Sequence, residues 1–214
     1  MLHAQRKFIP AMHSLADYWL PGEQYEPAIR RTQNIFFYSD VMDDTELRCE
    51  ANSRLLGVNV VFLSEGMSYT GKKDMKAYLD SFFSVFLPYD IEYRGNVWNW
   101  RRIFRDVHEK VWSIYEKAGV FGKDVKAYRF FDPMPITVSN HNIRLAFYEM
   151  PNGNRLLIMA NKTKDPVTGI VDLSKSKSGN FTLPELYVNE KIEVKSGKFK
   201  ITIPPRTIRI TEWK

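Results

Sequence analysis

The stretch Leu55-Leu56-Gly57-Val58-Asn59-Val60-Val61-Phe62-Leu63-Ser64-Glu65-Gly66 decides how the first half of the chain folds. Residues 58–63 are apolar on both faces except at one asparagine, which is typical of a parallel strand covered on both sides. Residues 43–56 have helical spacing, and Gly57 suits the left-handed position that follows a helix. This order predicts a parallel α/β arrangement with residues 58–63 as a central strand and Glu65 at its carboxyl end.

A second segment near the start of the chain has the same local pattern. Residues 15–20 form an apolar and aromatic run, a short strand or a loop, that closes on the turn signal Pro21-Gly22 and then on Glu23. Parallel strands end at the same edge of a sheet. Glu23 and Glu65 are therefore expected on one face of the structure.

Two further helices are predicted after Glu65. Residues 72–87 and 97–118 carry apolar side chains at mostly i, i+3 and i+4 intervals, and Pro88-Tyr89-Asp90 separates them. Gly119 ends the second pattern. The Trp and Phe residues of the second helix are interpreted as core and not as a sugar-binding platform.

The helical pattern stops near Asp124, and short strands separated by turns follow. Pro151-Asn152-Gly153-Asn154 and Lys195-Ser196-Gly197-Lys198 are hairpin signals, and residues 207–213 alternate between two faces. The predicted strands are residues 125–131, 143–149, 156–161, 169–173, 186–188, 191–194, 198–203 and 207–213.

The two patterns predict an α/β domain followed by an all-β domain. Residues 1–124 are expected to form a partial, (β/α) barrel-like parallel sheet with helices, and residues 125–214 a C-terminal antiparallel β-sandwich. About 120 residues are half of what an eight-stranded barrel needs. The first domain is therefore either a small open sheet, of which a flavodoxin-like sheet is one form, or the carboxyl half of a barrel.

Composition narrows the functional classes. The chain has 214 residues, 44% of them hydrophobic, which is enough for a packed core. The basic residues behind the net charge of +6 are scattered, so we interpret them as solvated surface and predict no nucleic-acid partner. No apolar span reaches membrane length, and residues 1–7 lack a signal-peptide pattern, so no membrane partner is predicted. We make no prediction of localisation, because Met1 need not be the natural start of the protein.

The cysteine, histidine and glycine residues show no pattern that predicts a bound metal or cofactor. The single cysteine, Cys49, cannot form an intramolecular disulfide, and the four histidines are too dispersed for a metal cluster. No glycine-rich phosphate loop is present. We therefore predict neither a metal nor another cofactor.

Four stretches carry a resemblance to a known group of proteins. They are Tyr18-Trp19-Leu20-Pro21-Gly22-Glu23-Gln24-Tyr25, Leu56 to Glu65, Val111 to Val120, and Ile203 to Ile210 in the final strand region. Together they resemble the carboxyl-terminal half of large bacterial glycoside hydrolase-like proteins, in which a (β/α)8 barrel precedes a β-sandwich. The amino-terminal half of such a barrel is absent from this sequence.

The resemblance implies a hydrolase that cleaves glycosidic bonds with paired carboxylates. Glu23 and Glu65 are the candidate catalytic pair. Further candidates for contacts with a carbohydrate substrate are Trp19 and Tyr25, whose rings suit sugar stacking, and, as second-tier residues, Asp17, His3, His13 and Asp40.

The sequence leaves open the class of function and the partner of the first domain. The alternative to an enzyme is a non-catalytic carbohydrate-binding or accessory interaction module. A half barrel exposes unpaired strand edges, so the expected partner of the first domain is the missing amino-terminal part of the barrel or a second copy of the chain.

Overall fold

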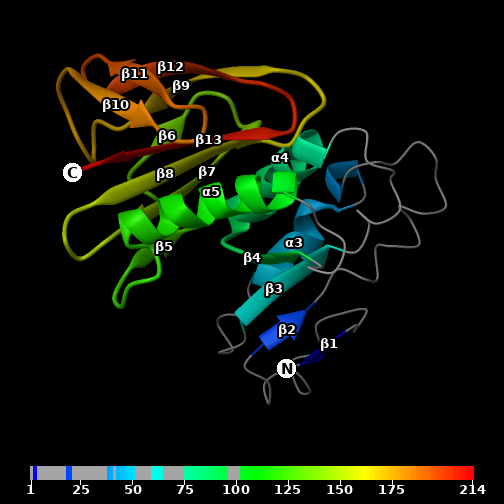
Figure 1. The fold of residues 1–214 in the computed structure, drawn as a ribbon. Coiled ribbons are helices and arrows are strands. Elements are labelled where there is room, and N and C mark those ends of the chain that lie inside the picture. Colours follow the sequence, from blue (N-terminus) through cyan, green and yellow to red (C-terminus); the bar gives the residue numbers. More distant parts are fainter. Residues whose placement is uncertain are drawn as a thin grey trace. The chain divides into compact units, whose positions relative to one another are not determined.

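The computed structural model describes the backbone of residues 2–3, 18–20, 38–40, 42–51, 59–64, 75–95 and 102–214. The chain divides into two compact units, Met1–Arg105 and Asp106–Lys214 (Figure 1). The division falls inside a helix, whereas the sequence prediction places the change of architecture after residue 124. The strands of the second unit begin at Lys126.

A parallel sheet forms the first unit. Its strands are β1 (Leu2–His3), β2 (Tyr18–Leu20), β3 (Asn59–Ser64) and β4 (Glu92–Gly95), in the spatial order β1-β2-β3-β4. All three pairings are parallel. The prediction of a central parallel strand over residues 58–63 is confirmed, because β3 lies between β2 and β4.

Helices follow β2 and β3 in the chain, as the sequence predicts. Helix α3 spans Asp44–Ala51 and helix α4 spans Met75–Phe86. A short 3-10 helix, η5 (Leu87–Tyr89), continues α4, and the Tyr89 hydroxyl donates a hydrogen bond of 2.9 Å to Asp44 Oδ1. This bond ties the end of η5 to the start of α3.

Helix α4 is buried around nearly its whole circumference. All residues from Tyr78 to Phe86 are buried, and the Phe82 and Phe86 rings lie 4.2 Å apart. A helix that is apolar on most sides belongs in a protein interior. Strand β4 was not predicted, because four mixed residues ending in glycine carry too little alternation to indicate a strand.

Helix α5 (Arg102–Ala118) ends where the sequence predicts. Gly119 has φ +90°, and its N–H donates to the Tyr115 carbonyl at 3.0 Å. A glycine in the left-handed region is the usual residue after a helix end.

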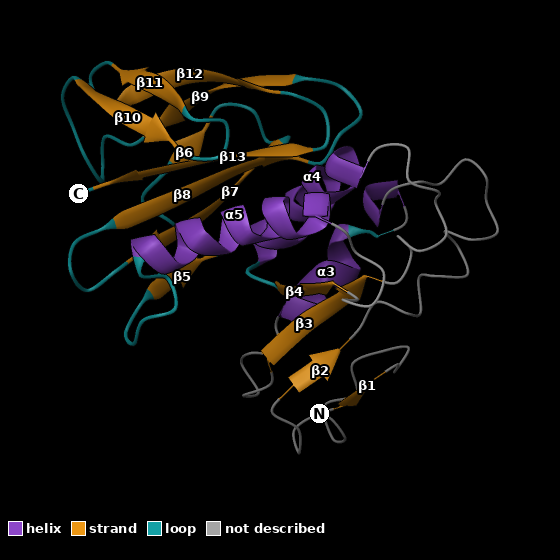
Figure 2. Ribbon diagram, in the orientation of Figure 1, coloured by secondary structure: helices purple, strands orange, loops and turns teal. Residues whose placement is uncertain are grey.

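The second unit is an antiparallel β-sandwich, which confirms the predicted C-terminal architecture (Figure 2). Its strands are β5 (Lys126–Tyr128), β6 (Thr137–Val138), β7 (Ile143–Glu149), β8 (Arg155–Asn161), β9 (Val167–Asp172), β10 (Phe181–Glu185), β11 (Glu190–Val194), β12 (Lys198–Ile203) and β13 (Thr207–Trp213). One sheet has the order β11-β10-β13-β8-β7-β5 and the other β12-β9-β6. Residues 119–214 contain no α-helix.

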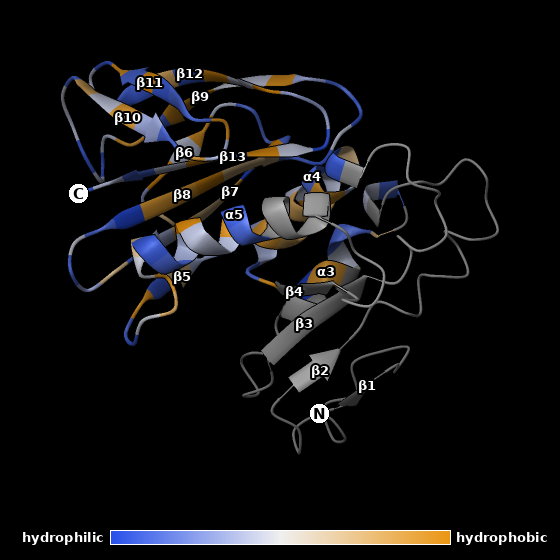
Figure 3. Cartoon of the chain, in the orientation of Figure 1, coloured by the Kyte–Doolittle hydropathy of each residue, from blue (hydrophilic) through white to orange (hydrophobic). Residues whose placement is uncertain are grey.

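The sandwich core lies between these two sheets. Phe147 of β7 stacks on Trp213 of β13 with ring centroids 5.7 Å apart, and Phe199 and Ile203 of β12 belong to the same buried cluster. Figure 3 shows hydrophobic residues in succession along β8. Continuous runs of this kind indicate a sheet that is buried on both faces.

The outer face of the six-stranded sheet is also buried. Tyr148, which faces away from the core cluster, is 2% exposed and its ring lies 5.7 Å from that of Tyr115 on α5. Ile208 and Ile210 on β13 share this outer face and are fully buried. Apart from Trp213, the apolar residues of the last strand therefore lie on the side that faces away from the second sheet.

The two predicted hairpin turns are present. Gly153 adopts φ +85°, and the Met150 N–H donates to the Asn154 carbonyl at 2.9 Å. Ser196 and Gly197 adopt φ 51° and 75°, the pattern of a tight type I′ connection.

The predicted strand at residues 186–188 is wrong. These residues form a turn, and the strand lies just before them, in β10. The turn forms because the Glu185 carboxylate accepts the backbone N–H groups of Tyr187 and Val188 at 3.3 and 2.6 Å. A side chain that bonds the backbone two and three residues ahead competes with strand pairing.

Candidate functional site

The carboxyl edge of the parallel sheet is the place where the sequence predicts a site. Strands β2 and β3 are adjacent and parallel, with Tyr18 aligned to Asn59 and Trp19 to Val60. Their carboxyl ends, at Leu20 and Ser64, therefore lie at the same edge of the sheet. In the sequence, Glu23 follows soon after the first end and Glu65 directly after the second.

Most of the predicted site residues lie outside the described residues. His3 and Trp19 belong to β1 and β2, but only their backbone is described. Asp40 ends the short helix η2 (Tyr38–Asp40) and is half-buried. The predicted residues outside the description are Glu23, Glu65, Asp17, Tyr25 and His13.

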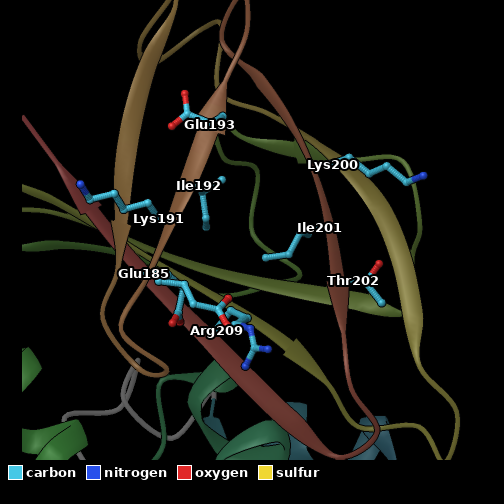
Figure 4. Close-up of a pocket in the computed structure, with 9 residues that line it drawn as sticks. Glu185, Lys191, Ile192, Glu193, Lys200, Ile201, Thr202 and Arg209 are labelled. Atoms are coloured by element: carbon cyan, nitrogen blue, oxygen red, sulfur yellow. The ribbon is translucent and has the colours of Figure 1, made fainter.

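A second, unpredicted site is a groove in the sandwich, between the edge strands β11 and β12 (Figure 4). The cavity has a volume of about 410 Å³ and is lined by strands of both sheets. Figure 4 shows Ile201 reaching from β12 toward Ile192 of β11, while Lys191 and Lys200 extend outward on opposite sides. Two isoleucines thus form apolar walls within a charged rim.

Glu185 lies at one end of this groove and is held by backbone groups. It is 2% exposed, and its carboxylate accepts the Ile210 N–H at 2.8 Å as well as the two turn N–H groups described above. Oε1 accepts the N–H groups of Ile210 and Tyr187, and Oε2 accepts that of Val188. Hydrogen bonds from several N–H groups compensate a buried carboxylate for lost water. The carboxylate is therefore a structural group that joins the turn to β13.

Arg209 enters the groove from β13. It pairs across the sheet with Met159, a member of the core cluster, so both side chains lie on the face that looks toward the second sheet. In the part of the chain that the structure describes, the Arg209 guanidinium forms no hydrogen bond or ion pair, and the same is true of the exposed carboxylate of Glu190. Arg209 and Glu190 thus both line the groove without pairing with each other.

Another polar cluster surrounds Glu149 at the far end of the sandwich. Tyr128 donates to Glu149 Oε2 at 3.1 Å, and Arg155 Nε lies 3.5 Å from Oε1. Burial, together with the neighbouring Glu149 carboxylate, raises the pKa of Tyr128 above its ordinary value. These three side chains satisfy one another, so this cluster offers no reactive group.

The described residues give no sign of two further classes of site. Within them, no three His, Cys, Asp or Glu side chains are placed to hold a metal ion. No helix of the described part is long and apolar enough to cross a membrane.

The chain is similar in fold to several solved structures. The chain is similar to a noncanonic maltogenic alpha-amylase from Thermotoga neapolitana, with a TM-score of 0.60 and 13% identity over 95% of this chain and 52% of that one. It is similar to a GH30 endoxylanase from Clostridium papyrosolvens, with a TM-score of 0.51 and 13% identity over 84% and 51% of the two chains. An alpha-amylase from Geobacillus thermoleovorans gives a TM-score of 0.50 at 6% identity, over 83% and 41%.

At these identities the likeness shows the fold alone. The chain spans about half the length of the first two structures. No family model matches the sequence. No curated protein matches it either.

Sequence reasoning did not find the groove. Alternation along the last strand separates Arg209 from Ile208 and Ile210, but it does not say which face meets the second sheet. The signal in the sequence is one charged residue, Arg209, between two isoleucines of a predicted strand. It becomes informative only once the pairing of Arg209 with Met159 is known.

Proposed function

We propose that this chain is the carboxyl-terminal part of a glycoside hydrolase built from a (β/α)8 barrel and a β-sandwich, and that it acts on carbohydrate. The order β2, α3, β3, α4, β4, with all strands parallel, supports a barrel segment, and the sandwich follows it. The fold likeness to about half of an alpha-amylase and half of an endoxylanase supports the same interpretation.

The parallel pairing of β2 with β3 is the observation that carries the proposed site. The two strands end at the same edge of the sheet, and Glu23 and Glu65 follow those two ends in the sequence. We therefore propose Glu23 and Glu65 as the two carboxylates that flank the scissile bond. The aromatic residues Trp19 and Tyr25 are proposed as faces for sugar rings.

Two carboxyl groups on one edge suffice for glycoside hydrolysis. One protonates the leaving oxygen, and the other attacks the sugar carbon or activates a water on the opposite side of the ring. No metal or organic cofactor is needed for this chemistry. The remaining strands of the barrel would come from an amino-terminal segment or from a second copy of the chain, pairing with the outer edges of β1 and β4.

The test is hydrolysis of nitrophenyl glycosides and soluble glucans and xylans by the longest natural protein that contains this sequence. Glu23→Gln and Glu65→Gln should each reduce kcat by orders of magnitude while the melting temperature stays nearly unchanged, because amide and carboxylate are nearly isosteric. Glu26→Gln, a carboxylate three residues beyond Glu23, is the matched control and should retain activity.

The outcomes separate the two classes of function. Full activity in Glu23→Gln or Glu65→Gln removes that residue from the catalytic role. Binding of glycans without hydrolysis by the unsubstituted protein contradicts the enzyme and favours a non-catalytic carbohydrate-binding module.

A further inference from the structure

We propose that the groove between β11 and β12 binds a sugar acid, with Arg209 receiving its carboxylate and Glu190 its hydroxyl groups. This site belongs to the sandwich, and the proposal does not depend on whether the parallel sheet carries hydrolysis. Its volume of about 410 Å³ lies within the roughly 300 to 1,000 Å³ of small-molecule pockets.

The placement of Arg209 is the first reason. A guanidinium on the inner face of a sandwich has lost part of its water, and within the described residues no carboxylate replaces that water. Such a group favours a ligand anion, and the planar fork of Arg fits a carboxylate through two parallel hydrogen bonds. Glu185 forms no ion pair with Arg209, and its oxygens accept three backbone N–H groups.

The charge of the lining decides what kind of anion fits. Arg209, Lys191 and Lys200 are balanced by Glu185, Glu190 and Glu193, so the lining has no net charge. A phosphate or sulfate dianion would meet the carboxylates of Glu185 and Glu190 on the groove side, which disfavours it relative to a monoanion. A single carboxylate directed at Arg209 avoids this repulsion.

Glu190 and the two isoleucines of the groove indicate the chemistry of the rest of the ligand. Glu190 pairs with Glu185 across the hairpin, so its side chain lies on the groove side of β11, and as a carboxylate it accepts hydrogen bonds from hydroxyl groups. Ile192 and Ile201 provide apolar walls for the C–H faces of a ring. A ring with one carboxylate, several hydroxyls and apolar faces is a uronic acid, either free or within a polysaccharide.

The experiment titrates the full 214-residue chain with glucuronate, galacturonate, a galacturonate trimer, glucose, acetate and inorganic phosphate, by calorimetry and by methyl NMR. We expect both uronates to bind and to shift the methyl signals of Ile192 and Ile201, while glucose, acetate and phosphate bind at least about tenfold more weakly. A trimer that binds more tightly than galacturonate assigns the site to polysaccharide, and equal affinity assigns it to the free acid.

Variants locate the contact. Arg209→Met should weaken uronate binding by roughly 10- to 100-fold, and Arg209→Lys by less, because a point charge replaces the fork. Lys195→Met removes an exposed positive charge outside the lining of the groove and is the matched control, so its affinity should stay within about twofold.

Several results would overturn the proposal. They are uronate binding no tighter than acetate, phosphate binding tighter than uronate, or equal losses in Arg209→Met and Lys195→Met. Absence of methyl shifts in the unsubstituted chain would overturn it without any variant.

Discussion

Removing the carboxylate of Glu185 is expected to detach one hairpin of the sandwich from the rest of its sheet. Strand β10 aligns with β13 at a single residue pair, Glu185 with Thr211. The other links at this junction are the bonds from Ile210 N–H to Glu185, from Leu186 N–H to the Ile210 carbonyl at 2.7 Å, and from Thr211 Oγ1 to the Pro184 carbonyl at 2.8 Å.

The magnitude follows from what Glu185→Ala leaves unpaired. Ile210 is fully buried, so its N–H would lose its acceptor where water does not reach, at a cost of about 1 to 3 kcal/mol. Val188 is 37% exposed, so water can replace its bond, and that loss is smaller. Relief from burying a charge offsets part of the sum. We expect a net loss of about 2 kcal/mol in the free energy of unfolding.

Urea unfolding monitored by Trp fluorescence measures this loss. Glu185→Gln keeps one carbonyl oxygen but turns an amide N–H₂ toward a backbone donor, so its expected loss is about 1 to 2 kcal/mol. The matched control is Glu190→Ala, which removes an exposed carboxylate on the facing strand and should change stability by less than about 0.5 kcal/mol. Equal stabilities for Glu185→Ala and Glu190→Ala would refute the structural role of Glu185.

Three further predictions concern the backbone, the parallel sheet and acid stability. Val61→Asp, in the central strand β3, should cost about 4 kcal/mol or more in urea unfolding, and a melting temperature within two degrees of the parent would contradict that placement. Gly197→Ala should destabilise the protein more than Gly153→Ala. Both glycines have positive φ, but of the two only Gly197 would bring a Cβ against backbone atoms, at 2.9 Å. Equal losses of stability in the two variants would refute this close approach. Burial acts to raise the pKa of Asp132, but the Arg129 hydrogen bonds outweigh it and hold that pKa below its usual value. The contribution of the Asp132 carboxylate to stability is therefore present above about pH 4 and lost as the pH falls further. Asp132→Asn should lose less stability than the parent on acidification. Parallel profiles of stability against pH for the two proteins would contradict this.

The elements that the sequence predicts correctly are those decided by neighbouring residues. Residues 58–63 indicate a strand through their continuous apolar run, and β3 occupies Asn59–Ser64 between β2 and β4. Gly119 and Gly153 mark a helix end and a hairpin because left-handed backbone favours glycine. Each of these signals acts over a few residues and does not depend on partners far along the chain.

The elements that it mispredicts depend on distant partners. Residues 186–188 look extended by composition, yet Glu185 holds them in a turn while also accepting a bond from Ile210 in a strand that follows much later. Strand β4 has weak alternation of its own and pairs with β3 across a helix. The catalytic pair Glu23 and Glu65 remains a prediction, carried by the adjacency of β2 and β3.

The groove at Arg209 shows why a periodic pattern alone does not locate a site. An apolar–polar alternation is normally interpreted with the apolar side in the core, which would direct Arg209 to solvent. In this sheet both faces are buried, with Tyr115 of α5 against Tyr148 on the outer side, so the isoleucines of β13 lie outward and its polar residues look between the sheets. Thr207 and Thr211, both buried, flank Arg209 on that inner face. A polar strip in the inter-sheet space weakens apolar packing there, and the cavity lies where that strip meets the open edge of β11 and β12.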